Sequence, residues 1–469
     1  MAKPARPDQK VRIHRTPSAR ALAAIIRTLA PLLRDDAPPA DATVAATLKA
    51  FNLGPAERED LIQTVRAVIA RRAQLNWWVA RSMPGAVMDE PSSLLAASLV
   101  LESHVEGDGL ISRGRDLRRE FDIDTYAWDK LVPALRGKTL NHPTQPRAVR
   151  LNMPAWIEHH FQASFGRDWE KEAAALSERP VVHLRVNTLK TTRDDAIVAL
   201  KKNDIQAFAA PYSPTGLRVP EPSDVAGSKP FHDGLVEFQD EGAQLASLLC
   251  DAKPGQRVID YCAGAGGKSL ALAAIMANRG TIIACDPAEN RLARAQLRFK
   301  RAGATMVERR VLDAAGRKRI KRAAETFDRA LIDVPCTGTG AWRRNPDAKW
   351  KSKPENLANL ITTQRDIVAR AARLVKPGGR LIYVTCSMLD EENGKQIEWF
   401  LESNKEFSAL DAPSLWTSII GKAPPENARH GAFIRLTPRH HGTDGFFIAV
   451  LERAAKRREP KPSGEPAAP

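Results

Sequence analysis

The sequence contains no run of about 18 or more apolar residues, so no part of it predicts a membrane-spanning helix. Its first residues, MAKPARPDQKVRIHR, are basic but lack the apolar stretch of a secretory signal. Only 5 cysteines occur among 469 residues, and none of them form a Cys-x-x-Cys pair, which excludes a disulfide framework and a zinc ribbon. These absences favour a reduced, cytoplasmic protein with no bound metal and no membrane partner.

The charges are unevenly balanced, with 71 Lys and Arg against 55 Asp and Glu and a net charge of +16. Such a surplus indicates a polyanionic partner such as nucleic acid, although basic proteins without one are also common. Hydrophobic residues make up 43% of the chain, which is enough for folded cores and too much for a largely disordered protein. The length predicts two to four domains.

Apolar periodicity and chain breakers divide the sequence into five expected segments. Residues 1–15 form a flexible basic arm, which either contacts RNA or is simply solvated, and residues 454–469 form a disordered charged tail. In residues 16–145 apolar side chains recur every three or four positions, which predicts an all-helical domain with buried faces. This domain shows no catalytic cluster, so we expect it to bind RNA or to dock onto a partner.

The two remaining segments mix helices with strands. In residues 150–230 the order strand, helix, strand, strand predicts a small α+β module of the ferredoxin- or RRM-like type, which would position RNA. In residues 231–453 strands alternate with helices, which predicts a mainly parallel sheet covered on both faces, with ligands at the carboxyl ends of its strands. The expected strands are Arg257–Cys262, Thr281–Cys285, Met306–Val311, Arg329–Val334, Arg380–Cys386 and Gly445–Leu451.

A glycine-rich segment, CAGAGGKS at residues 262–269, joins the first of these strands to a helix. Glycines let the backbone approach a ligand, and the amino end of the helix offers free N–H groups to negative charge. A P-loop would need glycine at position 262, which is Cys, and a dinucleotide fingerprint would need glycine at 269, which is Ser. The segment therefore indicates a different adenosine ligand.

Three acids, Asp286, Asp313 and Asp333, follow or end successive strands. Asp286 lies 19 residues past Gly267, about where an acid reaches the ribose hydroxyls in nucleotide-binding α/β folds. Each acid alone could be a helix cap or a loop residue, but with the glycine loop they predict a ring around one pocket. S-adenosylmethionine fits such a pocket, because it needs a ribose acceptor, an adenine contact and a partner for its cationic methionine end.

Cys336 and Cys386 follow the fourth and fifth strands, and adjacent parallel strand ends would bring both thiols to one mouth. Cys250 and Cys285, in contrast, are expected to be small buried residues. A thiolate that adds to C6 of a pyrimidine activates C5 for methyl transfer, and a nearby acid stabilises the adduct. Two thiols and the carboxylate of Asp333 match these needs.

Several short motifs lie between residues 150 and 453. They are RVNT at 185–188, CAGAGGK at 262–268, DVPCTGTG at 333–340, RRNPD at 343–347 with Trp350, KPGG at 376–379, TCS at 385–387 and DGFF at 444–447. Together they resemble the RNA cytosine-C5 methyltransferases of the RsmB/Nop2/Sun type, in particular the bacterial ribosomal branch. The resemblance implies a Rossmann-like class I methyltransferase domain that uses S-adenosyl-L-methionine. The helical front resembles, by position and helicity, the NusB-like RNA-binding domain of the bacterial ribosomal enzymes.

The resemblance also implies a role for each site residue. Cys386 is the nucleophile, Cys336 assists product release, and Asp333 contacts the base close to the cofactor. Asp286 holds the ribose, and Asp313 lies on the adenine side. The residues implied around the methionine end are Cys262, Ala263, Gly264, Ala265, Gly266, Gly267 and Lys268. Cytosine methyltransferases of DNA use the cysteine after the fourth strand instead, which makes Cys336 the rival nucleophile.

Two departures from the family pattern concern the cofactor pocket. Ala265 replaces the usual proline, which would loosen the loop and weaken cofactor binding, and Leu312 precedes Asp313 where a glycine is more typical. A cluster of cations, Arg343, Arg344, Lys349 and Lys351, follows the Cys336 loop. We expect these side chains to contact phosphates beside a flipped base, although a solvated charged loop is the alternative.

The expected function is therefore methylation of C5 of a cytosine in RNA, with 16S rRNA as the favoured substrate and a monomeric enzyme. A transfer RNA substrate is one alternative, and a non-catalytic RNA-binding assembly factor is another. A methyltransferase of proteins or small molecules is a third, against which the net charge of +16 and the additional α+β module argue.

Overall fold

The chain forms two compact units in this computed structural model, which describes residues 16–102, 105, 107–221 and 223–455. The first unit comprises the chain up to Pro180 together with Ala341–Asn356, and the second comprises Val181–Gly340 together with the chain from Leu357 onward. The expected arm at 1–15 and the expected tail, apart from its first two residues, lie outside the described residues.

The first unit is helical, as the apolar periodicity predicts, and continues past the expected boundary at residue 145. Its helices are α1 (Ala19–Leu32), α2 (Ala40–Ala50), α3 (Pro55–Ala70), α4 (Arg72–Ser82), α5 (Pro91–Leu101), α6 (Gly107–Phe121), α7 (Trp128–Leu135), α8 (Arg147–Arg150), α9 (Glu158–Phe165), α10 (Trp169–Ala175) and α17 (Pro346–Lys351). The Ser18 hydroxyl begins α1 by accepting the N–H of Ala21 at 3.1 Å. One face of α1 and one face of α3, with Leu29 and Val68 among them, are buried in a common core.

The segment Ala341–Asn356 lies between two strands of the large sheet in sequence, yet it belongs to the helical unit. The indole N–H of Trp350 donates to the carbonyl of Ile69 at 2.7 Å, and the Trp350 ring packs against the helical core. Trp342 is fully buried beside Phe161, with 6.3 Å between ring centroids. Because Ile69 and Trp350 lie 281 positions apart, local sequence patterns could not predict that this segment belongs to the helical unit.

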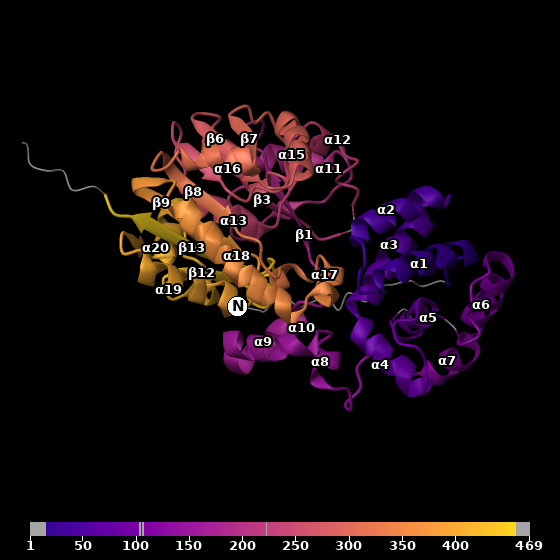
Figure 1. Ribbon diagram of the computed structural model, residues 1–469. Helices are drawn as coiled ribbons and strands as arrows, with labels where there is room; N and C mark the ends of the chain where they lie inside the picture. Colours follow the sequence, from indigo (N-terminus) through magenta and orange to yellow (C-terminus); the bar gives the residue numbers. More distant parts are fainter. Residues whose placement is uncertain (1–15, 103–104, 106, 222, 456–469) are drawn as a thin grey trace, which may run out of the picture. The chain divides into compact units, whose positions relative to one another are not determined.

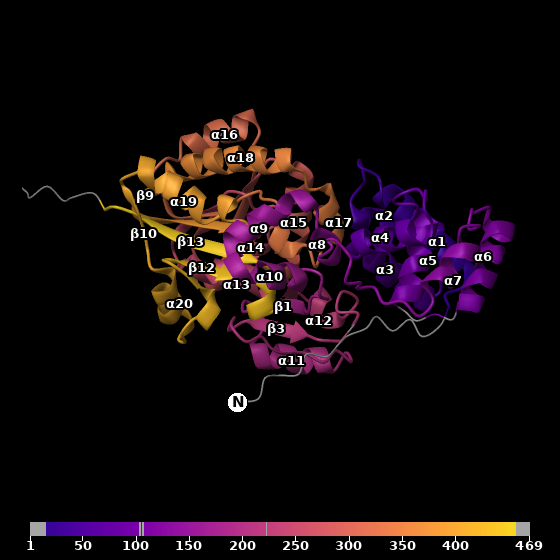
Figure 2. The same ribbon diagram turned by 90° about the horizontal axis from the view of Figure 1, so that it is seen from below.

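A small antiparallel sheet begins the second unit, with strand order β2-β3-β1-β4. Its strands are β1 (Val182–Val186), β2 (Phe208–Ala209), β3 (Gly216–Val219) and β4 (Val236–Phe238). Helix α11 (Arg193–Lys201) buries Ala196 and Leu200 against this sheet, and Figure 2 shows the helix along β1 and β3. A second, short helix, α12 (Lys229–His232), precedes β4. This is the ferredoxin-like order, and its last strand, β4, follows the expected boundary at residue 230.

The large sheet has nine strands, and its main path runs β11-β12-β13-β9-β8-β5-β6-β7, with β10 paired to β13. The strands are β5 (Arg257–Asp260), β6 (Thr281–Asp286), β7 (Val307–Val311), β8 (Phe327–Asp333), β9 (Val375–Thr385), β10 (Phe407–Ala409), β11 (Arg429–His430), β12 (Phe433–Leu436) and β13 (Phe446–Arg453). All six expected strands are present, and β5 to β9 are parallel. The expectation missed β10, β11 and β12, which have three, two and four residues.

Helices lie between most of these strands (Figure 1). They are α13 (Glu241–Leu249), α14 (Gly267–Ile275), α15 (Glu289–Ala302), α16 (Ala314–Lys321), α18 (Pro354–Ala372), α19 (Gly394–Ser403), α20 (Ala412–Ile420) and α21 (Pro438–His441). The central strands are apolar because both sheet faces are covered; Ile259 and Ile382, for example, have no exposed surface. Among the described residues, no helix combines the length and apolar character needed to cross a membrane.

Candidate active site

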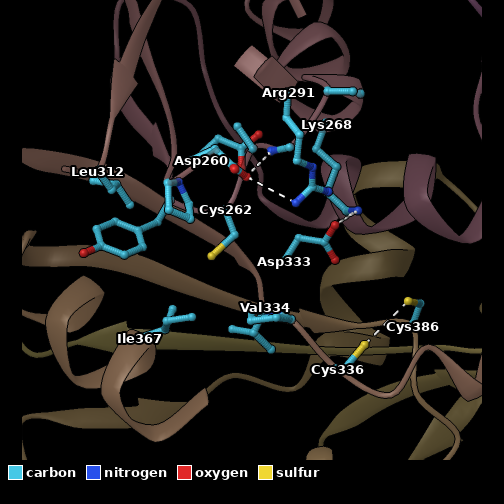
Figure 3. A pocket seen from close by; sticks show the side chains of 18 of the residues that line it. Asp260, Cys262, Lys268, Arg291, Leu312, Asp333, Val334, Cys336, Ile367 and Cys386 are labelled. Atoms are coloured by element: carbon cyan, nitrogen blue, oxygen red, sulfur yellow. Dashed lines mark hydrogen bonds and ion pairs between the residues drawn. The ribbon is translucent and has the colours of Figure 1, made fainter. Parts of the chain in front are cut away.

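A cavity of about 650 Å³ opens at the carboxyl ends of β5, β6, β8 and β9 (Figure 3). All the residues that line it belong to the second unit. The adjacency of these strands brings the glycine loop, Asp286, Asp333 and both expected catalytic cysteines to one site. Its volume lies in the range of pockets that enclose cofactor-sized molecules.

The glycine loop makes a sharp turn between β5 and α14. Gly264 and Gly266 have φ angles of +54° and +78°, which is the left-handed region that favours glycine. A Cβ atom on Gly266 would lie 2.6 Å from the ring of Phe299, so a side chain at this position would force the loop or the ring to move. The carboxylate of Asp286 accepts the N–H of Gly264 at 2.9 Å and thereby fixes the loop to the end of β6.

An arginine from outside the loop supports the position where the family pattern has proline. Arg298 of α15 donates to the carbonyl of Ala265 at 2.7 Å. Its guanidinium also pairs with Glu237 of β4 at 3.4 Å, and Glu237 pairs with Arg301 at 2.6 Å. The small sheet therefore contributes to the stability of the cofactor loop, through a residue that sequence reasoning did not single out.

Most residues expected at the cofactor line the cavity, namely Cys262, Ala263, Gly264, Ala265, Gly267, Lys268, Asp286 and Asp333. Gly266 shapes the turn without lining the cavity. Asp313 does not line the cavity: its carboxylate accepts the N–H of Gly316 at 2.6 Å and caps α16, and its place on the adenine side stays a prediction. The residue that lines the cavity at this strand end is Leu312.

Lys268 and Asp333 form an ion pair inside the cavity, with 2.6 Å between Nζ and the carboxylate oxygen. Burial by itself lowers the pKa of Lys268, but the charge of Asp333 and its hydrogen bond outweigh burial and raise that pKa. Lys268 is therefore charged at neutral pH, and it holds the Asp333 carboxylate in place. One oxygen of Asp333 stays available to a ligand on the side of the cysteines (Figure 3).

Asp260, which ends β5, is a cavity residue that sequence reasoning missed. It is fully buried, and burial raises the pKa of Asp260 to about 6. One carboxylate oxygen accepts the Ser269 hydroxyl at 2.7 Å, while the other has no hydrogen-bond partner among the described residues. The strand-end rule that selected Asp286 and Asp333 also applies to this position and could have found it.

The two cysteine thiols lie in contact, with 3.5 Å between the Sγ atoms of Cys336 and Cys386 (Figure 3). The pKa of Cys336 is raised well above its ordinary value by its bond to Cys386, by burial, and by the negative charges of Cys386 and Glu392. Formation of a thiolate is therefore disfavoured at Cys336. Cys250 and Cys285 are fully buried, as expected.

Glu392 connects the two loops that carry these thiols, and sequence reasoning missed it. One carboxylate oxygen accepts the N–H of Thr337 at 2.8 Å, and the other accepts the Thr337 hydroxyl at 2.5 Å and the Ser387 hydroxyl. Gln364 donates to the first oxygen at 3.0 Å. Thr337 directly follows Cys336 and Ser387 directly follows Cys386, so one buried carboxylate fixes the positions of both thiols.

The structure contradicts the expected phosphate contacts of Arg343 and Lys349. Their exposed fractions are 6% and 1%, and burial lowers the pKa of Lys349 to about 7. Both lie in the segment that packs within the helical unit, where Lys349 lies near the rings of Trp342 and Trp350. In the sequence, Trp342 precedes Arg343 and Trp350 follows Lys349, and these large apolar neighbours could have indicated that the two cations are buried. Arg344 is half-buried in the same segment, and its proposed RNA contact stays untested.

Comparison with known proteins gives a consistent assignment. The family described as 16S rRNA methyltransferase RsmB/F matches residues 247–452, and the ferredoxin-like domain of RsmF/B-like methyltransferases matches residues 153–226. Ribosomal RNA small subunit methyltransferase B of Shewanella oneidensis is 33% identical over 66% of this chain and 69% of its own length. A probable ribosomal RNA small subunit methyltransferase B of Synechocystis is 28% identical over 88% of this chain and 95% of its own length.

Solved structures agree with this assignment. The crystal structure of PH0851 has a TM-score of 0.78 and 26% identity, and the match covers 93% of this chain and 99% of that one. A methyltransferase homologue from Pyrococcus horikoshii has a TM-score of 0.56 and 29% identity over 66% of this chain and 97% of its own. The expected methyltransferase domain and ferredoxin-like module are thus confirmed, whereas the NusB-like character of the helical unit stays a prediction. By these matches and by the geometry of its site, the chain belongs to the RsmB/F family of 16S rRNA methyltransferases, which act on RNA with S-adenosylmethionine.

Proposed function

We propose that this protein methylates C5 of a cytosine in 16S rRNA through a covalent adduct between Cys386 and C6 of the base. The observation that carries the proposal is the contact of Cys336 and Cys386 beside Asp333, at the mouth of the cofactor cavity. The raised pKa of Cys336 disfavours its thiolate, which supports Cys386 rather than Cys336 as the nucleophile.

The cavity residues fit S-adenosylmethionine. When bound, this cofactor supplies an electrophilic methyl group. Asp260 has a buried carboxylate oxygen without a partner, which suits the cationic amino group of the cofactor. The two oxygens of Asp286 accept the N–H groups of Gly264 and Ala288 at 2.9 Å each, and the oxygen bonded to Gly264 also lies 3.6 Å from Arg291. The oxygen bonded to Ala288 can accept a further bond from a ribose hydroxyl.

The other residues act on the cytosine. The Cys386 thiolate adds to C6, which makes the ring enamine-like and places electron density on C5. As negative charge develops on the ring, N3 takes up the proton that Cys386 released, and Asp333, held by Lys268, accepts hydrogen bonds from N3–H and from the exocyclic amino group. Once C5 carries the methyl group, a base takes the C5 proton, the electron pair of the C5–H bond re-forms the C5–C6 double bond, and the C6–S bond breaks so that Cys386 leaves as thiolate. Cys336, at 3.5 Å from Cys386, assists this release.

The experiment is methyl transfer from labelled S-adenosylmethionine to unmethylated 16S rRNA and to transfer RNA. Wild type, Cys386→Ala and Cys336→Ala are compared, with Cys250→Ala as a control for loss of a cysteine outside the cavity. We expect 5-methylcytosine in 16S rRNA with wild type, no product with Cys386→Ala, and a trapped protein–RNA adduct with Cys336→Ala.

If Cys336→Ala gave no product and Cys386→Ala trapped the adduct, Cys336 would be the nucleophile and Cys386 would assist release. If only transfer RNA were labelled, the substrate would be transfer RNA and not 16S rRNA. RNA binding without any label would favour the assembly-factor alternative. We also propose that the enzyme is a cytoplasmic monomer, which sedimentation of the RNA-free protein tests through its mass of 51.5 kDa.

A further inference from the structure

A strongly basic stretch occupies residues 289–322, which hold twelve Lys and Arg but only three Asp and Glu. It therefore carries more than half of the net charge of +16. Helix α15, the edge strand β7 and helix α16 make up this stretch, and Figure 1 shows them toward one end of the large sheet. Only Arg291, Arg298 and Arg317 of these cations line the cofactor cavity.

Part of this stretch lines a second cavity of about 260 Å³, which shares no lining residue with the first. Four arginines line it: Arg257 of β5, Arg310 of β7, Arg319 of α16, and Arg322 at the carboxyl end of α16. The remaining lining residues are Ile283, Ile320, Ala323, Thr326 and Phe327, so no carboxylate belongs to the lining. We call this cavity the arginine groove.

The guanidinium groups of the groove are only partly compensated. Arg310 pairs with Glu308 at 3.0 Å, and Arg257 lies 4.8 Å from the ring centre of Phe327. Arg319 and Arg322 are exposed and form no ion pair within the part of the chain that the structure describes. Because like charges around one groove repel each other, an anionic ligand would relieve the repulsion.

We propose that the arginine groove binds phosphate groups of the RNA backbone, away from the pocket where the target cytosine reacts. Guanidinium groups match phosphate oxygens in a bidentate geometry, and apart from Thr326 the other lining residues of the groove are apolar. The proposal rests on the RNA substrate of the proposed function. It also supplies phosphate contacts in place of Arg343 and Lys349, which are buried.

Helix α16 links the groove to the reaction site. Arg317 of this helix lines the cofactor cavity, whereas Arg319 lines the groove. A helix of eight residues is about 12 Å long. Arg257 and Phe327 of the groove begin β5 and β8, whose last residues, Asp260 and Asp333, line the cofactor cavity. The groove therefore lies at the amino ends of these strands, and an RNA that occupies both sites extends about 20 Å along β8 and α16.

The test compares wild type with the triple variant Arg310→Gln/Arg319→Gln/Arg322→Gln. RNA affinity is measured from 50 to 300 mM salt with a labelled fragment of unmethylated 16S rRNA, and methyl transfer is measured in parallel. We expect about tenfold weaker RNA binding or more at 0.1 M salt, and a smaller slope of log affinity against log salt, by about two to three. KM for RNA rises, while kcat and the affinity for S-adenosylmethionine stay unchanged.

Two control variants test whether weaker RNA binding comes from the loss of charge in the groove, and not from a change in folding or in the overall charge. The variant Arg310→Lys/Arg319→Lys/Arg322→Lys keeps the charges and should retain most of the salt slope. The variant Lys405→Gln/Lys422→Gln/Arg429→Gln removes three exposed cations elsewhere in the second unit and should bind RNA as wild type does.

Unchanged affinity and slope in the groove variant would overturn the proposal, as would an equal loss in the distant control. This outcome is distinguishable from failure of the proposed function. If wild type binds RNA but transfers no methyl group, the binding arm still tests the groove, whereas active methylation with an unchanged groove variant refutes the groove alone.

Discussion

At the scale of single residues, Glu392 determines how the two thiols are held. Replacing it by Gln keeps one acceptor oxygen and places an NH2 group at the other, so the donors of Thr337 and Gln364 or the hydroxyls of Thr337 and Ser387 lose their acceptor. Each buried donor left unpaired costs about 1–3 kcal/mol, so the cysteine loops should lose their alignment. We expect Glu392→Gln to lower kcat at least about tenfold with unchanged affinity for S-adenosylmethionine.

A thiol titration separates this positioning role from general destabilisation. Loss of the negative charge of Glu392 should lower the pKa of Cys336, so alkylation of Cys336 should begin at lower pH. Cys386→Ala is compared with Cys386→Ala/Glu392→Gln, and peptide mapping identifies the alkylated residue. Glu398→Gln, at an exposed position of the same helix α19, is the matched control for kcat. An unchanged pH profile would contradict the electrostatic part of this role.

Asp260 gives a prediction for pH dependence. Its folded pKa of about 6 lies above its ordinary value of 3.8, so the cofactor-free protein binds more protons than the unfolded chain between these values. This group therefore stabilises the fold less as pH rises through that window, and Asp260→Asn should raise the free energy of unfolding at pH 8 by about 1–3 kcal/mol.

Cofactor binding should respond to Asp260 in the opposite direction. Its ionised form is the partner of the cofactor cation, so wild-type affinity for S-adenosylmethionine should fall as pH decreases below about 6. Calorimetric titration at pH 5 to 8 should show that Asp260→Asn binds more weakly at pH 8 and lacks this pH dependence. Equal affinities at pH 8 would contradict the assignment of Asp260 to the cofactor.

At the scale of elements, α15 and the glycine loop act together. Arg298→Ala removes the donor to the Ala265 carbonyl, and we expect about tenfold weaker binding of S-adenosylmethionine because the loop becomes more mobile. Adding Ala265→Pro, the residue of the family pattern, should restore part of the affinity by limiting the loop in another way. Arg294→Ala, an exposed change on the same helix, is the control.

Restoration by proline distinguishes support of the loop from loss of a charge near the cofactor. A proline that restores nothing would show that Arg298 acts through its charge alone. The pairing of Arg298 with Glu237 of β4 predicts a further coupling, in which Glu237→Gln also weakens cofactor binding, by less than Arg298→Ala does.

At the scale of the whole molecule, the segment Ala341–Asn356 makes the helical unit depend on residues that the sequence places within the catalytic domain. Its buried Lys349 has a pKa lowered to about 7 from an ordinary 10.5, so the unfolded chain binds more protons between these values. The free energy of unfolding should therefore rise with pH from 7 to 10.5, with a slope of at most about 1.4 kcal/mol per pH unit.

The variant Lys349→Met should be more stable than wild type at pH 7 and should lose this part of the pH dependence. Urea unfolding followed by tryptophan fluorescence checks it, since Trp342 and Trp350 lie near the changed side chain. Lys405→Met, an exposed position, is the control. A destabilised Lys349→Met would show that the charge has a compensating partner, which contradicts the predicted pH effect.

Much of the reaction site could be predicted from the sequence alone. The glycine loop, Asp286, Asp333 and both cysteines are local features, each next to a strand whose apolar run is visible in the sequence, and parallel strands in register bring their carboxyl ends together. Carboxylates, thiols and glycines at the ends of expected strands were therefore enough to predict where the pocket lies.

Other features depend on contacts between residues far apart in sequence, which only the tertiary structure decides. The Ile69–Trp350 contact joins residues 281 positions apart, and it holds the segment with the buried Arg343 and Lys349 in the helical unit. The arginine groove joins Arg257 to residues more than 50 positions later. Periodicity predicts which side chains are buried within one element, but the partner of each buried face is set by packing between elements.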